Sequence, residues 1–350
     1  MDYRPLGRTG LSVSALSLGT MTWGTQNTED EGFAQMDYAL ERGLNLWDAA
    51  ELYPTPTAAE TLGRTEEIIG NWMAARGTRD KIILASKVLG RSENRWFRDG
   101  DREPRLTARD IEEAVNKSLK RLKTDRIDLY QVHWPDRTTT QFGSNPMVYN
   151  TPKKVDDETP IHESLEALDR LVKAGKVLHI GISNESTWGL MKWIAAADAG
   201  HGPRIASIQN AYSLVNRTFE VNLAEAALRE DVSLLAYSAL AQGYLTGKYR
   251  GGALPEGARK TLYNRLTRYE GPGAEVANDK YVALAEEAGL DPAQMAIAFA
   301  MSRPFMTSVI IGATRMEQLK SVIDAADITL GDDLLAEIDK VQRAHGNPSP

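Results

Sequence analysis

The stretch Asn45-Leu-Trp-Asp-Ala-Ala-Glu-Leu-Tyr53 places a carboxylate and a phenol directly after a short apolar run. Residues 44–47 have the length of a buried strand, and Asp48 follows at the position where that strand should end. Tyr53 comes shortly afterwards, in a segment that Pro54 and Pro56 keep from being helical. What this acid and this phenol do depends on the side chains that follow the other strands.

The same alternation of a short apolar run with a helical pattern extends along the chain. In residues 107–122, for example, Thr107 can cap a helix in which Ile111, Val115 and Leu119 recur at a spacing of four residues. The pattern predicts eight strands, at residues 15–18, 44–47, 82–86, 127–132, 178–182, 205–208, 232–236 and 308–311.

Eight strands separated by helices predict an α/β protein with a parallel (β/α)8 TIM barrel, because parallel neighbours need long right-handed crossovers. We expect residues 1–350 to form one domain. An N-terminal β-hairpin at residues 3–14 should cap the barrel, and long loops should follow the fourth strand (134–158) and the seventh (239–273). The alternative is an open doubly wound sheet, but its phosphate-binding pattern Gly-x-Gly-x-x-Gly does not occur in the sequence.

The composition excludes several classes of protein. A formal net charge of −7, from 41 basic and 48 acidic side chains, argues against a nucleic-acid partner. The absence of cysteine excludes disulfides, a thiolate nucleophile and Cys-ligated metals. The N-terminus lacks the apolar core of a signal peptide, and nowhere do 18 apolar residues run together. We therefore expect a cytoplasmic protein with no membrane partner.

In a barrel, the carboxyl ends of all the strands meet at one rim, so residues far apart in the sequence converge there. The predicted strands end in polar side chains, at Asp48, Lys87, His133, Ser183, Asn184, Gln209, Tyr237 and Thr314. For any one of them alone, the simpler interpretation is that a strand ends in something polar. Together they predict a binding rim.

Four residues at or next to this rim have the chemistry of a proton-transfer site. A phenol with a pKa of about 10 is a poor acid at neutral pH, and a neighbouring ammonium such as that of Lys87 would lower that pKa. Asp48 would pair with Lys87 and hold it. Tyr53 then becomes a general acid, and His133 would donate or relay a hydrogen bond to the same substrate oxygen.

Metal chemistry and Schiff-base chemistry are the alternatives for the same rim. The histidines, at positions 133, 162, 179, 201 and 345, form neither His-x-His nor His-Glu-x-x-His, so no metal site is predicted. A lysine at the end of a barrel strand also suits Schiff-base chemistry, and this alternative stays open for Lys87.

Several motifs resemble those of the aldo-keto reductases, in order and over nearly the whole chain. They are Gly-Thr-Met-Thr-Trp-Gly (19–24), Leu-Trp-Asp-Ala-Ala-Glu-Leu-Tyr (46–53), Ser-Lys-Val (86–88), Asp-Leu-Tyr-Gln-Val-His-Trp-Pro (128–135), Gly-Ile-Ser-Asn (181–184), Ile-Gln-Asn (208–210), Leu-Ala-Tyr-Ser (235–238) and Gly-Tyr-Leu-Thr-Gly-Lys-Tyr (243–249). Within that family the chain looks most similar to the bacterial Tas-like proteins, in the branch that includes the potassium channel β subunits.

The resemblance implies an NADP(H)-dependent oxidoreductase that reduces a small aldehyde or ketone, with Asp48, Tyr53, Lys87 and His133 at the matching catalytic positions. It also implies a set of cofactor-binding residues. They are Ser183, Asn184 and Gln209 at the nicotinamide carboxamide, Tyr237 stacked on the ring, Ser238 and Leu240 after it, Lys248 and Arg259 at the phosphates, and Gly312, Thr314 and Gln318 at the adenosine phosphate.

Two details qualify the cofactor site. Arg315 adds charge at the adenosine end, which favours NADPH over NADH. Val322 departs from the family, which commonly has asparagine at that position, so one hydrogen bond to adenine is in doubt. The simpler interpretation of Lys248 and Arg259 is a solvated basic loop.

The substrate pocket is predicted to be aromatic, because Trp23, Trp47 and Trp134 lie beside strand ends, although each could instead pack a loop. Residues 91–105 and 134–158 should decide specificity, and arginines in the first segment could select a carboxylated aldehyde. The competing hypothesis is a cofactor-binding regulatory or adaptor subunit with slow redox chemistry, as the channel-subunit resemblance suggests.

Overall fold

Eight parallel strands close into a barrel in the computed structural model, which describes residues 1–139, 155–264 and 267–349. Their order around the barrel is β10-β3-β4-β5-β6-β7-β8-β9. The strands are β3 (Leu16–Gly19), β4 (Leu46–Asp48), β5 (Ile83–Val88), β6 (Ile127–Val132), β7 (Val177–Ser183), β8 (Ser207–Ala211), β9 (Ser233–Tyr237) and β10 (Met306–Ile311). This closure confirms the predicted (β/α)8 barrel and excludes the open sheet.

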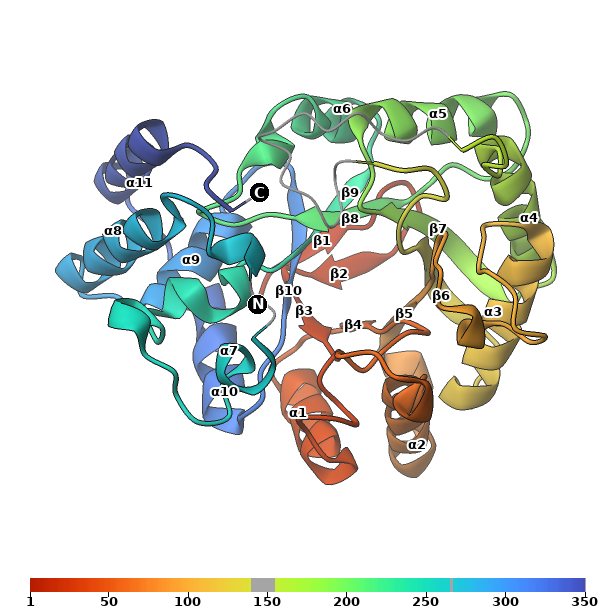
Figure 1. Cartoon of the computed structure of the whole chain (residues 1–350), viewed down its shortest axis with the longest axis horizontal. Coiled ribbons are helices and arrows are strands. Elements are labelled where there is room, and N and C mark those ends of the chain that lie inside the picture. Colours follow the sequence, from red (N-terminus) through yellow and green to blue (C-terminus); the bar gives the residue numbers. More distant parts are fainter. Residues whose placement is uncertain (140–154, 265–266, 350) are drawn as a thin grey trace.

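Helices surround the barrel (Figure 1). They are α1 (Glu29–Glu41), α2 (Arg64–Arg76), α3 (Ala108–Leu122), α4 (Ile161–Lys173), α5 (Thr187–Asp198), α6 (Leu223–Arg229), α8 (Ala274–Glu287), α9 (Pro292–Met301), α10 (Met316–Asp324) and α11 (Asp332–His345). Local chemistry sets several of their starts. Thr107 caps α3 as predicted, and Thr28 forms a reciprocal capping box with Glu31 at the start of α1.

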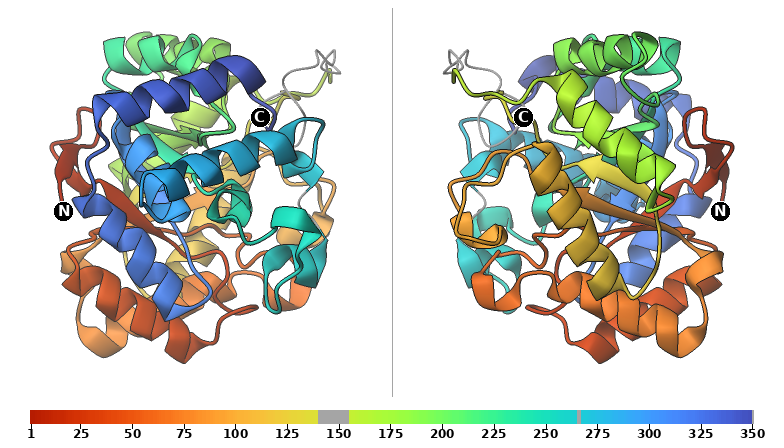
Figure 2. Two further views of the ribbon diagram at one scale, coloured as in Figure 1. Left: turned by 90° about the vertical axis from the view of Figure 1, so that its left-hand side faces the viewer. Right: turned by 90° about the vertical axis from the view of Figure 1, so that its right-hand side faces the viewer.

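A β-hairpin closes one end of the barrel, as predicted. Strands β1 (Tyr3–Pro5) and β2 (Ser12–Ser14) pair in antiparallel fashion, and Leu6, directly after β1, and Val13, in β2, are completely buried. These two side chains pack in one cluster with interior barrel residues that include Leu46 and Leu129. Figure 2 shows the hairpin at one end of the barrel and the segment that contains α7 (Arg259–Tyr263) at the other. The strand ends are therefore reached from the end opposite the hairpin.

Side chains along the strands alternate between the interior and the helices, as period-two geometry requires. Leu46 points inward, Trp47 packs outward on Trp72 of α2 with ring centroids 6.0 Å apart, and Asp48 points inward again. In β5, Ser86 points outward and donates a hydrogen bond to Glu66 of α2. Asp48, Lys87, Gln131 and Gln209 thus form a polar layer above the apolar floor, in which Lys87 and Gln131 are register partners.

One segment differs from the predictions. The predicted loop 239–273 contains short helices in its described part, at η5 (Ala241–Thr246), η6 (Arg250–Gly252), α7 and η7 (Thr267–Tyr269). The short helix η4 (Thr218–Glu220) precedes α6, and Pro160 occupies the N-cap position of α4 without a side-chain hydrogen bond. Most of the predicted loop 134–158 lies outside the described residues. Within the described ranges, no helix is long and apolar enough to cross a membrane.

Candidate active site

A buried ion pair occupies the centre of the polar layer. Nζ of Lys87 donates hydrogen bonds to Oδ2 of Asp48 at 2.7 Å and to the carbonyl oxygen of Ala49 at 2.8 Å. Lys87 has no solvent exposure, and Asp48 is 3% exposed. Nε2 of Gln209 (2.8 Å) and Nε2 of Gln131 (3.3 Å) both donate to Oδ1 of Asp48. Both carboxylate oxygens therefore have donors, as a buried charge requires.

Tyr53 and His133 lie beside this pair. Nζ of Lys87 is 4.9 Å from the centroid of the Tyr53 ring, and the His133 ring meets that ring edge-on, with centroids 5.9 Å apart and planes at 86°. The structure thus brings together Asp48, Tyr53, Lys87 and His133 from four separate strand ends or loops. A phenol, an ammonium, a carboxylate and an imidazole share one small volume at the barrel mouth.

The charges differ in one respect from the sequence-based expectation. Burial raises the pKa of the Tyr53 phenol above its usual value of 10.0; the Asp48 carboxylate raises it further, and Arg259 acts in the opposite direction. We expected Lys87 to lower this pKa, but its ammonium lies over the ring face and donates to Asp48 and Ala49. Burial also lowers the pKa of Lys87, which Asp48 opposes. Tyr53 is therefore a protonated phenol at neutral pH.

His133 is neutral at physiological pH. Burial, and then the charge of Lys87, hold the pKa of His133 well below 6.5. Its Nδ1 is buried and has no hydrogen-bond partner among the described residues. Its backbone is fixed on both sides, because its N–H donates to the carbonyl oxygen of Val88 at 2.8 Å and its carbonyl oxygen accepts from Nδ2 of Asn184 at 2.8 Å.

The three predicted carboxamide-binding residues form one hydrogen-bonded group with Tyr237. Oγ of Ser183 donates to the carbonyl oxygen of Gln209 at 2.6 Å, and Nδ2 of Asn184 donates to Oγ of Ser183 at 3.1 Å. The hydroxyl of Tyr237 donates to Oδ1 of Asn184 at 2.6 Å. Oε1 of Gln209 has no donor among the described residues, so one amide acceptor is left for a ligand.

The connection after β9 brings two cations towards the barrel mouth. Ser238 is left-handed (φ 59°) and its carbonyl oxygen accepts from the N–H of Ala241, while Leu240 packs against the core. Further on, Lys248 and Arg259 have no carboxylate partner in the described ranges. Arg259 is close enough to Tyr53 to lower its pKa, and the pKa of Lys248 is lowered by burial and then by Arg259. These two side chains fit an anion.

The segment after β10 is ordered by its own hydrogen bonds. The N–H and Oγ1 of Thr314 donate to Oε1 of Gln318, at 3.2 and 3.3 Å, and the carbonyl oxygen of Thr314 accepts from Asn27. Gly312 passes close to β3, because a Cβ there would lie 3.3 Å from the carbonyl oxygen of Gly19. Arg315 is exposed beside them, whereas Val322 is buried in the core.

The structure corrects the prediction that three tryptophans line a substrate pocket. Trp23 and Trp47 have no solvent exposure; Trp23 donates from Nε1 to Oε1 of Gln35 in α1, and Trp47 packs on Trp72. Both belong to the layer between barrel and helices, because strand alternation turns Trp47 away from Asp48. Trp134 is half-buried with its ring centroid 5.0 Å from that of His133, so it alone of the three lies at the candidate site.

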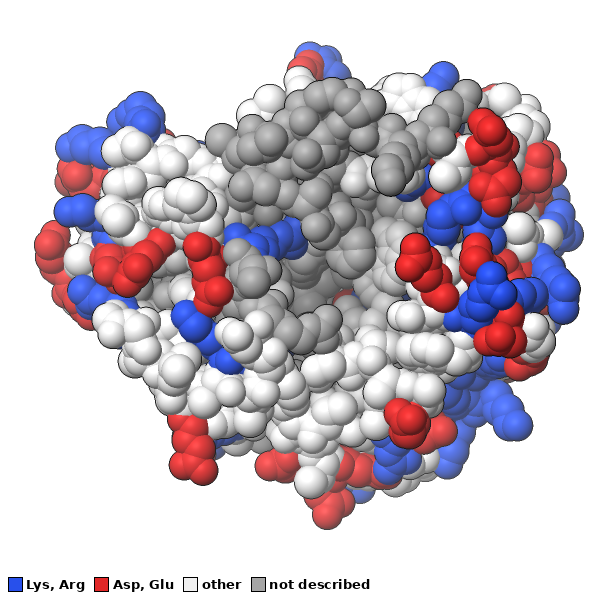
Figure 3. Space-filling model, viewed as in Figure 1, with Lys and Arg blue, Asp and Glu red and all other residues white. Residues whose placement is uncertain are grey.

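The arginines of residues 91–105 are not free to select a carboxylate. Each one is paired with an acidic side chain of the protein, in the pairs Arg91–Asp136, Arg95–Glu103, Arg98–Glu51, Arg102–Asp110 and Arg105–Asp136. On the face of the molecule shown in Figure 3, acidic and basic side chains accordingly lie close together over α3 and α4. This corrects the suggestion that these arginines bind a carboxylated substrate.

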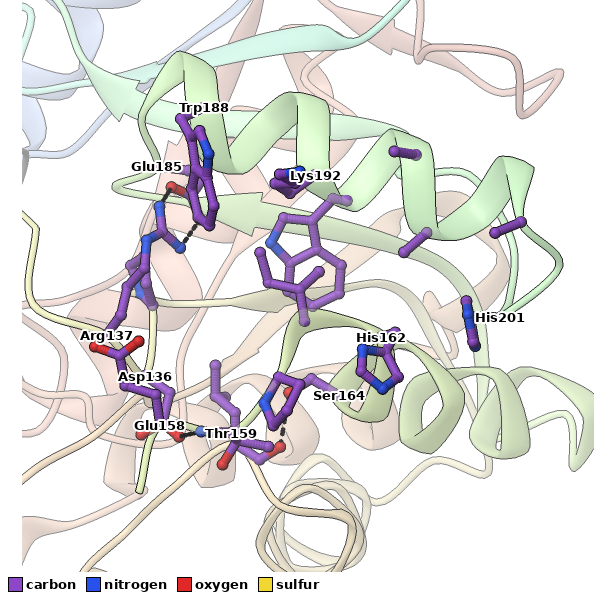
Figure 4. Close-up of a pocket in the computed structure, with 18 of the residues that line it drawn as sticks. Asp136, Arg137, Glu158, Thr159, His162, Ser164, Glu185, Trp188, Lys192 and His201 are labelled. Carbon is purple, nitrogen blue, oxygen red and sulfur yellow. Dashed lines mark hydrogen bonds and ion pairs between the residues drawn. The ribbon is translucent and has the colours of Figure 1, made fainter. Parts of the chain in front are cut away.

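A second hollow, of about 570 Å³, lies away from the barrel mouth, between α4, α5 and the segment that follows β6 (Figure 4). Arg137 is among the residues that line it, pairs with Glu185 and lies 4.8 Å over the ring of Trp188. None of the predicted catalytic, cofactor-binding or tryptophan residues lines it, whereas Pro135, Asp136 and Glu158 of the predicted specificity segment 134–158 do. In the described ranges, no group of three or more His, Asp or Glu side chains could hold a metal ion.

Gln131 is the residue of the polar layer that sequence reasoning missed. It lies in β6 two residues before His133, is completely buried, and donates to Asp48. Gly181 leaves room for it, because a Cβ at Gly181 would lie 3.1 Å from Cγ of Gln131. A polar side chain in the middle of an otherwise apolar inward-facing register was the available signal.

Comparison with known proteins places this geometry in a family. The profile described as "Aldo/keto reductase family" matches residues 15–343 of the chain. The chain belongs to the aldo/keto reductase family. Like its family, it is an oxidoreductase.

Individual members of the family cover the whole chain. "Protein tas" of Escherichia coli (strain K12) is 48% identical over 355 aligned positions, which span 100% of both chains. "Uncharacterized oxidoreductase YrpG" of Bacillus subtilis (strain 168) is 35% identical over 100% of this chain and 98% of its own. A "probable voltage-gated potassium channel subunit beta" of Arabidopsis thaliana is 30% identical over 94% of this chain and 92% of its own. The predicted resemblance to the Tas-like aldo-keto reductases and to the channel-subunit branch is confirmed.

Proposed function

We propose that this aldo/keto reductase is an NADPH-dependent enzyme that reduces an aldehyde or ketone to an alcohol. One observation carries the proposal: the protonated phenol of Tyr53 lies beside both the buried Lys87–Asp48 pair and the neutral imidazole of His133. A carbonyl that gains a hydride on carbon needs a proton on oxygen, and this phenol is placed to give one.

Each of the four residues has a defined part in that step. Tyr53 donates its hydroxyl proton to the carbonyl oxygen as negative charge develops there. His133, being neutral, donates a hydrogen bond to the same oxygen from one ring nitrogen. Lys87 and Asp48 hold each other through their contact of 2.7 Å and form the buried ion pair against which the Tyr53 ring lies.

The unpaired groups at the mouth fit a nicotinamide dinucleotide. When bound, the reduced nicotinamide supplies the hydride. Gln209, with Ser183 and Asn184, would hold the carboxamide, and Tyr237 would stack on the ring. Lys248 and Arg259 would contact the diphosphate. The remaining contacts, at the adenosine 2′-phosphate, would come from Gly312, Thr314, Arg315 and Gln318 and favour NADP(H).

The test is a fluorescence titration with NADPH and with NADH, followed by turnover on a panel of aldehydes and ketones. We expect tighter binding of NADPH and oxidation of NADPH by at least part of the panel. Tyr53→Phe should then lower kcat by about 10² to 10⁴, the usual contribution of a general acid, and leave the Kd for NADPH within about twofold. Unchanged turnover in that variant would remove Tyr53 from its role.

A second candidate function is a cofactor-binding regulatory or adaptor subunit. It is favoured by the 30% identity to a protein named as a probable potassium channel β subunit. This function predicts stoichiometric NADPH binding, negligible turnover on the carbonyl panel and a stable protein partner in a pull-down. A small carbonyl compound as the substrate, the cytoplasm as the location, and no nucleic-acid or membrane partner remain parts of the first proposal.

A Schiff-base lyase acting through Lys87 is the remaining alternative. The lowered pKa of Lys87 favours a nucleophilic amine. However, its Nζ donates to the carboxylate of Asp48 at 2.7 Å, and this charge favours the protonated ammonium, which has no lone pair for attack. Trapping of a carbonyl substrate on Lys87 by borohydride would support the lyase and contradict the reductase.

A further inference from the structure

We propose that Glu51 and Arg98 form a clamp that positions Tyr53 against Lys87 for proton donation, an inference that rests on the proposed function. The clamp lies outside the proton-transfer group itself. Glu51 lies in the segment after β4, which also carries Tyr53. Arg98 lies in the segment after β5, the strand that carries Lys87, so the clamp joins these two segments. Both residues act through Tyr53 and are positioning residues.

The segment that carries Tyr53 is irregular and needs an anchor. No helix or strand includes residues 49–58, and short-range hydrogen bonds such as that from the N–H of Tyr53 to the carbonyl oxygen of Ala50 do not tie it to the barrel. Away from β5, the carbonyl oxygen of Tyr53 accepts from the N–H of Gly63 at 3.0 Å, and the N–H of Thr55 donates to the carbonyl oxygen of Met21 at 2.8 Å. Its backbone ties to β5, besides the side-chain contact of Lys87 with Ala49, are the N–H of Ala49, which donates to Ala85, and the N–H of Glu51, which donates to the carbonyl oxygen of Lys87 at 3.2 Å. The second of these lies two residues before the phenol.

The side chain of Glu51 strengthens this second tie. Nη1 and Nη2 of Arg98 donate to its two carboxylate oxygens at 2.8 and 2.9 Å, in a bidentate fork. Oε1 also accepts from the N–H of Leu89 at 2.8 Å. Leu89 follows Lys87 by two residues, just as Glu51 precedes Tyr53 by two. The carboxylate therefore fixes the two backbones at equal chain distance from the phenol and the ammonium.

Arg98 is itself held rigidly. Its side chain has no solvent exposure and that of Glu51 has 4%. A long arginine is held in one rotamer only where its surroundings fix it, and Arg98 also donates to the carbonyl oxygen of Phe97 and lies 3.8 Å from Asp110 of α3. Burial alone would lower the pKa of Arg98, but the carboxylate of Glu51 outweighs it, so the pair is ionic.

Stability alone is a poor explanation for this pair. Replacing a buried ion pair by apolar residues of similar volume is often neutral or stabilising, so burial does not by itself explain why charges are present. Directional hydrogen bonds do explain it, because displacement of a catalytic group by about 1 Å can lower a rate by about a hundredfold. An apolar contact at this position would allow the Tyr53 segment to slide.

The test measures turnover of 4-nitrobenzaldehyde with NADPH in four proteins: the wild type, Arg98→Lys, Tyr53→Phe and the double variant. Lysine keeps the charge of Arg98 and loses the fork. We expect Arg98→Lys to lower kcat by about tenfold to a hundredfold, with the Kd for NADPH within about twofold of the wild type. Because the clamp acts through the phenol, Arg98→Lys should change the rate by less than about twofold once Tyr53 is phenylalanine.

The matched control is Arg95→Lys in the same segment, because Arg95 pairs with Glu103 at the surface and both side chains are about half exposed. It should leave kcat unchanged. If Arg98→Lys does not fold, Glu51→Leu combined with Arg98→Met removes both charges and should show the same loss of kcat. Wild-type turnover in a folded Arg98→Lys protein, or in a folded Glu51→Leu/Arg98→Met protein, would overturn the clamp. Failure of both variants to fold would also overturn it, because the pair would then serve stability.

The two proposals fail in different ways. Wild-type turnover in Tyr53→Phe would contradict the proposed function. Loss of turnover in Tyr53→Phe, with an undiminished additional loss from Arg98→Lys in that background, would leave the function standing and refute the clamp alone.

Discussion

The side-chain nitrogen of Gln209 donates a hydrogen bond of 2.8 Å to Oδ1 of Asp48, so the proposed cofactor site and the proposed proton-transfer site are one network. A carboxylate can only accept, and this contact therefore fixes which end of the Gln209 amide faces Asp48. Under the proposed function, Oε1 of Gln209 would accept from the amino group of the nicotinamide carboxamide. Gln209 would then bind the cofactor and also help to hold Asp48, the partner of Lys87.

Replacing Gln209 by leucine should weaken NADPH binding and slow turnover together. The variant loses the acceptor for the carboxamide and one donor to Asp48. A hydrogen bond between neutral groups contributes about 0.5–1.5 kcal/mol, so we expect the loss of the acceptor to raise the Kd for NADPH about twofold to tenfold. Fluorescence titration and steady-state kinetics measure the two effects.

Gln131→Leu is the control for this variant. Gln131 donates to the same Oδ1 at 3.3 Å but belongs to the strand before the candidate carboxamide site. We expect it to lower kcat severalfold and leave the Kd for NADPH unchanged. Equal effects of the two substitutions on cofactor binding would show that Gln209 has no separate part in recognition.

The rate of carbonyl reduction should be independent of pH from about 6.5 to 9. The proton donor is active below its pKa, and burial raises the pKa of Tyr53 above its ordinary 10.0, so the donor is lost only at strongly alkaline pH. At the acid limit, His133 stays neutral because its pKa is held well below 6.5. Profiles of kcat against pH in both directions test this: oxidation of the alcohol needs the phenolate and should accelerate with rising pH. A fall in the reduction rate between pH 7 and 8 would contradict it.

Leu6→Ala should destabilise the fold without changing turnover. Leu6 has no solvent exposure and packs with Leu46 and Leu129 on the barrel floor, below the polar layer. Truncation of a buried leucine costs about 2–5 kcal/mol of unfolding free energy. Chemical denaturation measures this loss, with Leu254→Ala as the exposed control, which should stay within about 0.5 kcal/mol of the wild type.

Arg315→Glu should reverse part of the cofactor preference. Arg315 is exposed next to Thr314, at the end where a 2′-phosphate would bind. We expect the KM for NADPH to rise about tenfold and that for NADH to stay within about twofold, because NADH lacks this phosphate. Arg109→Glu on α3 makes the same change of charge at another exposed position and should leave both values unaltered.

The fold and the central residues of the candidate site could be predicted because periodicity carries them. Apolar runs and helical spacing gave the eight strands, and the closure of a barrel then implied that Asp48, Lys87 and His133 converge without any knowledge of distances. Tyr53 was placed with them because it follows Asp48 closely along the chain.

The errors have physical causes of two kinds. Trp47 adjoins Asp48 in a strand, so the two side chains must face opposite ways. This alternation alone indicates that the indole of Trp47 points outward, to the helices. The fate of Trp23, by contrast, depends on Gln35 in a helix, and that of Arg98 depends on how an irregular segment bends towards Glu51. Such contacts follow from three-dimensional packing and leave no periodic trace. The five-residue helix α7 is likewise too short to show a repeat.

The hairpin of β1 and β2 closes one end of the barrel. Under the proposed function, a dinucleotide whose nicotinamide reaches Gln209 and a carbonyl compound that reaches Tyr53 would both enter from the end opposite the hairpin. If the nicotinamide lies deeper, beside the polar layer, the enzyme would load its cofactor first and release it last. Closure of the far end by a small N-terminal element would thus contribute to an ordered kinetic mechanism.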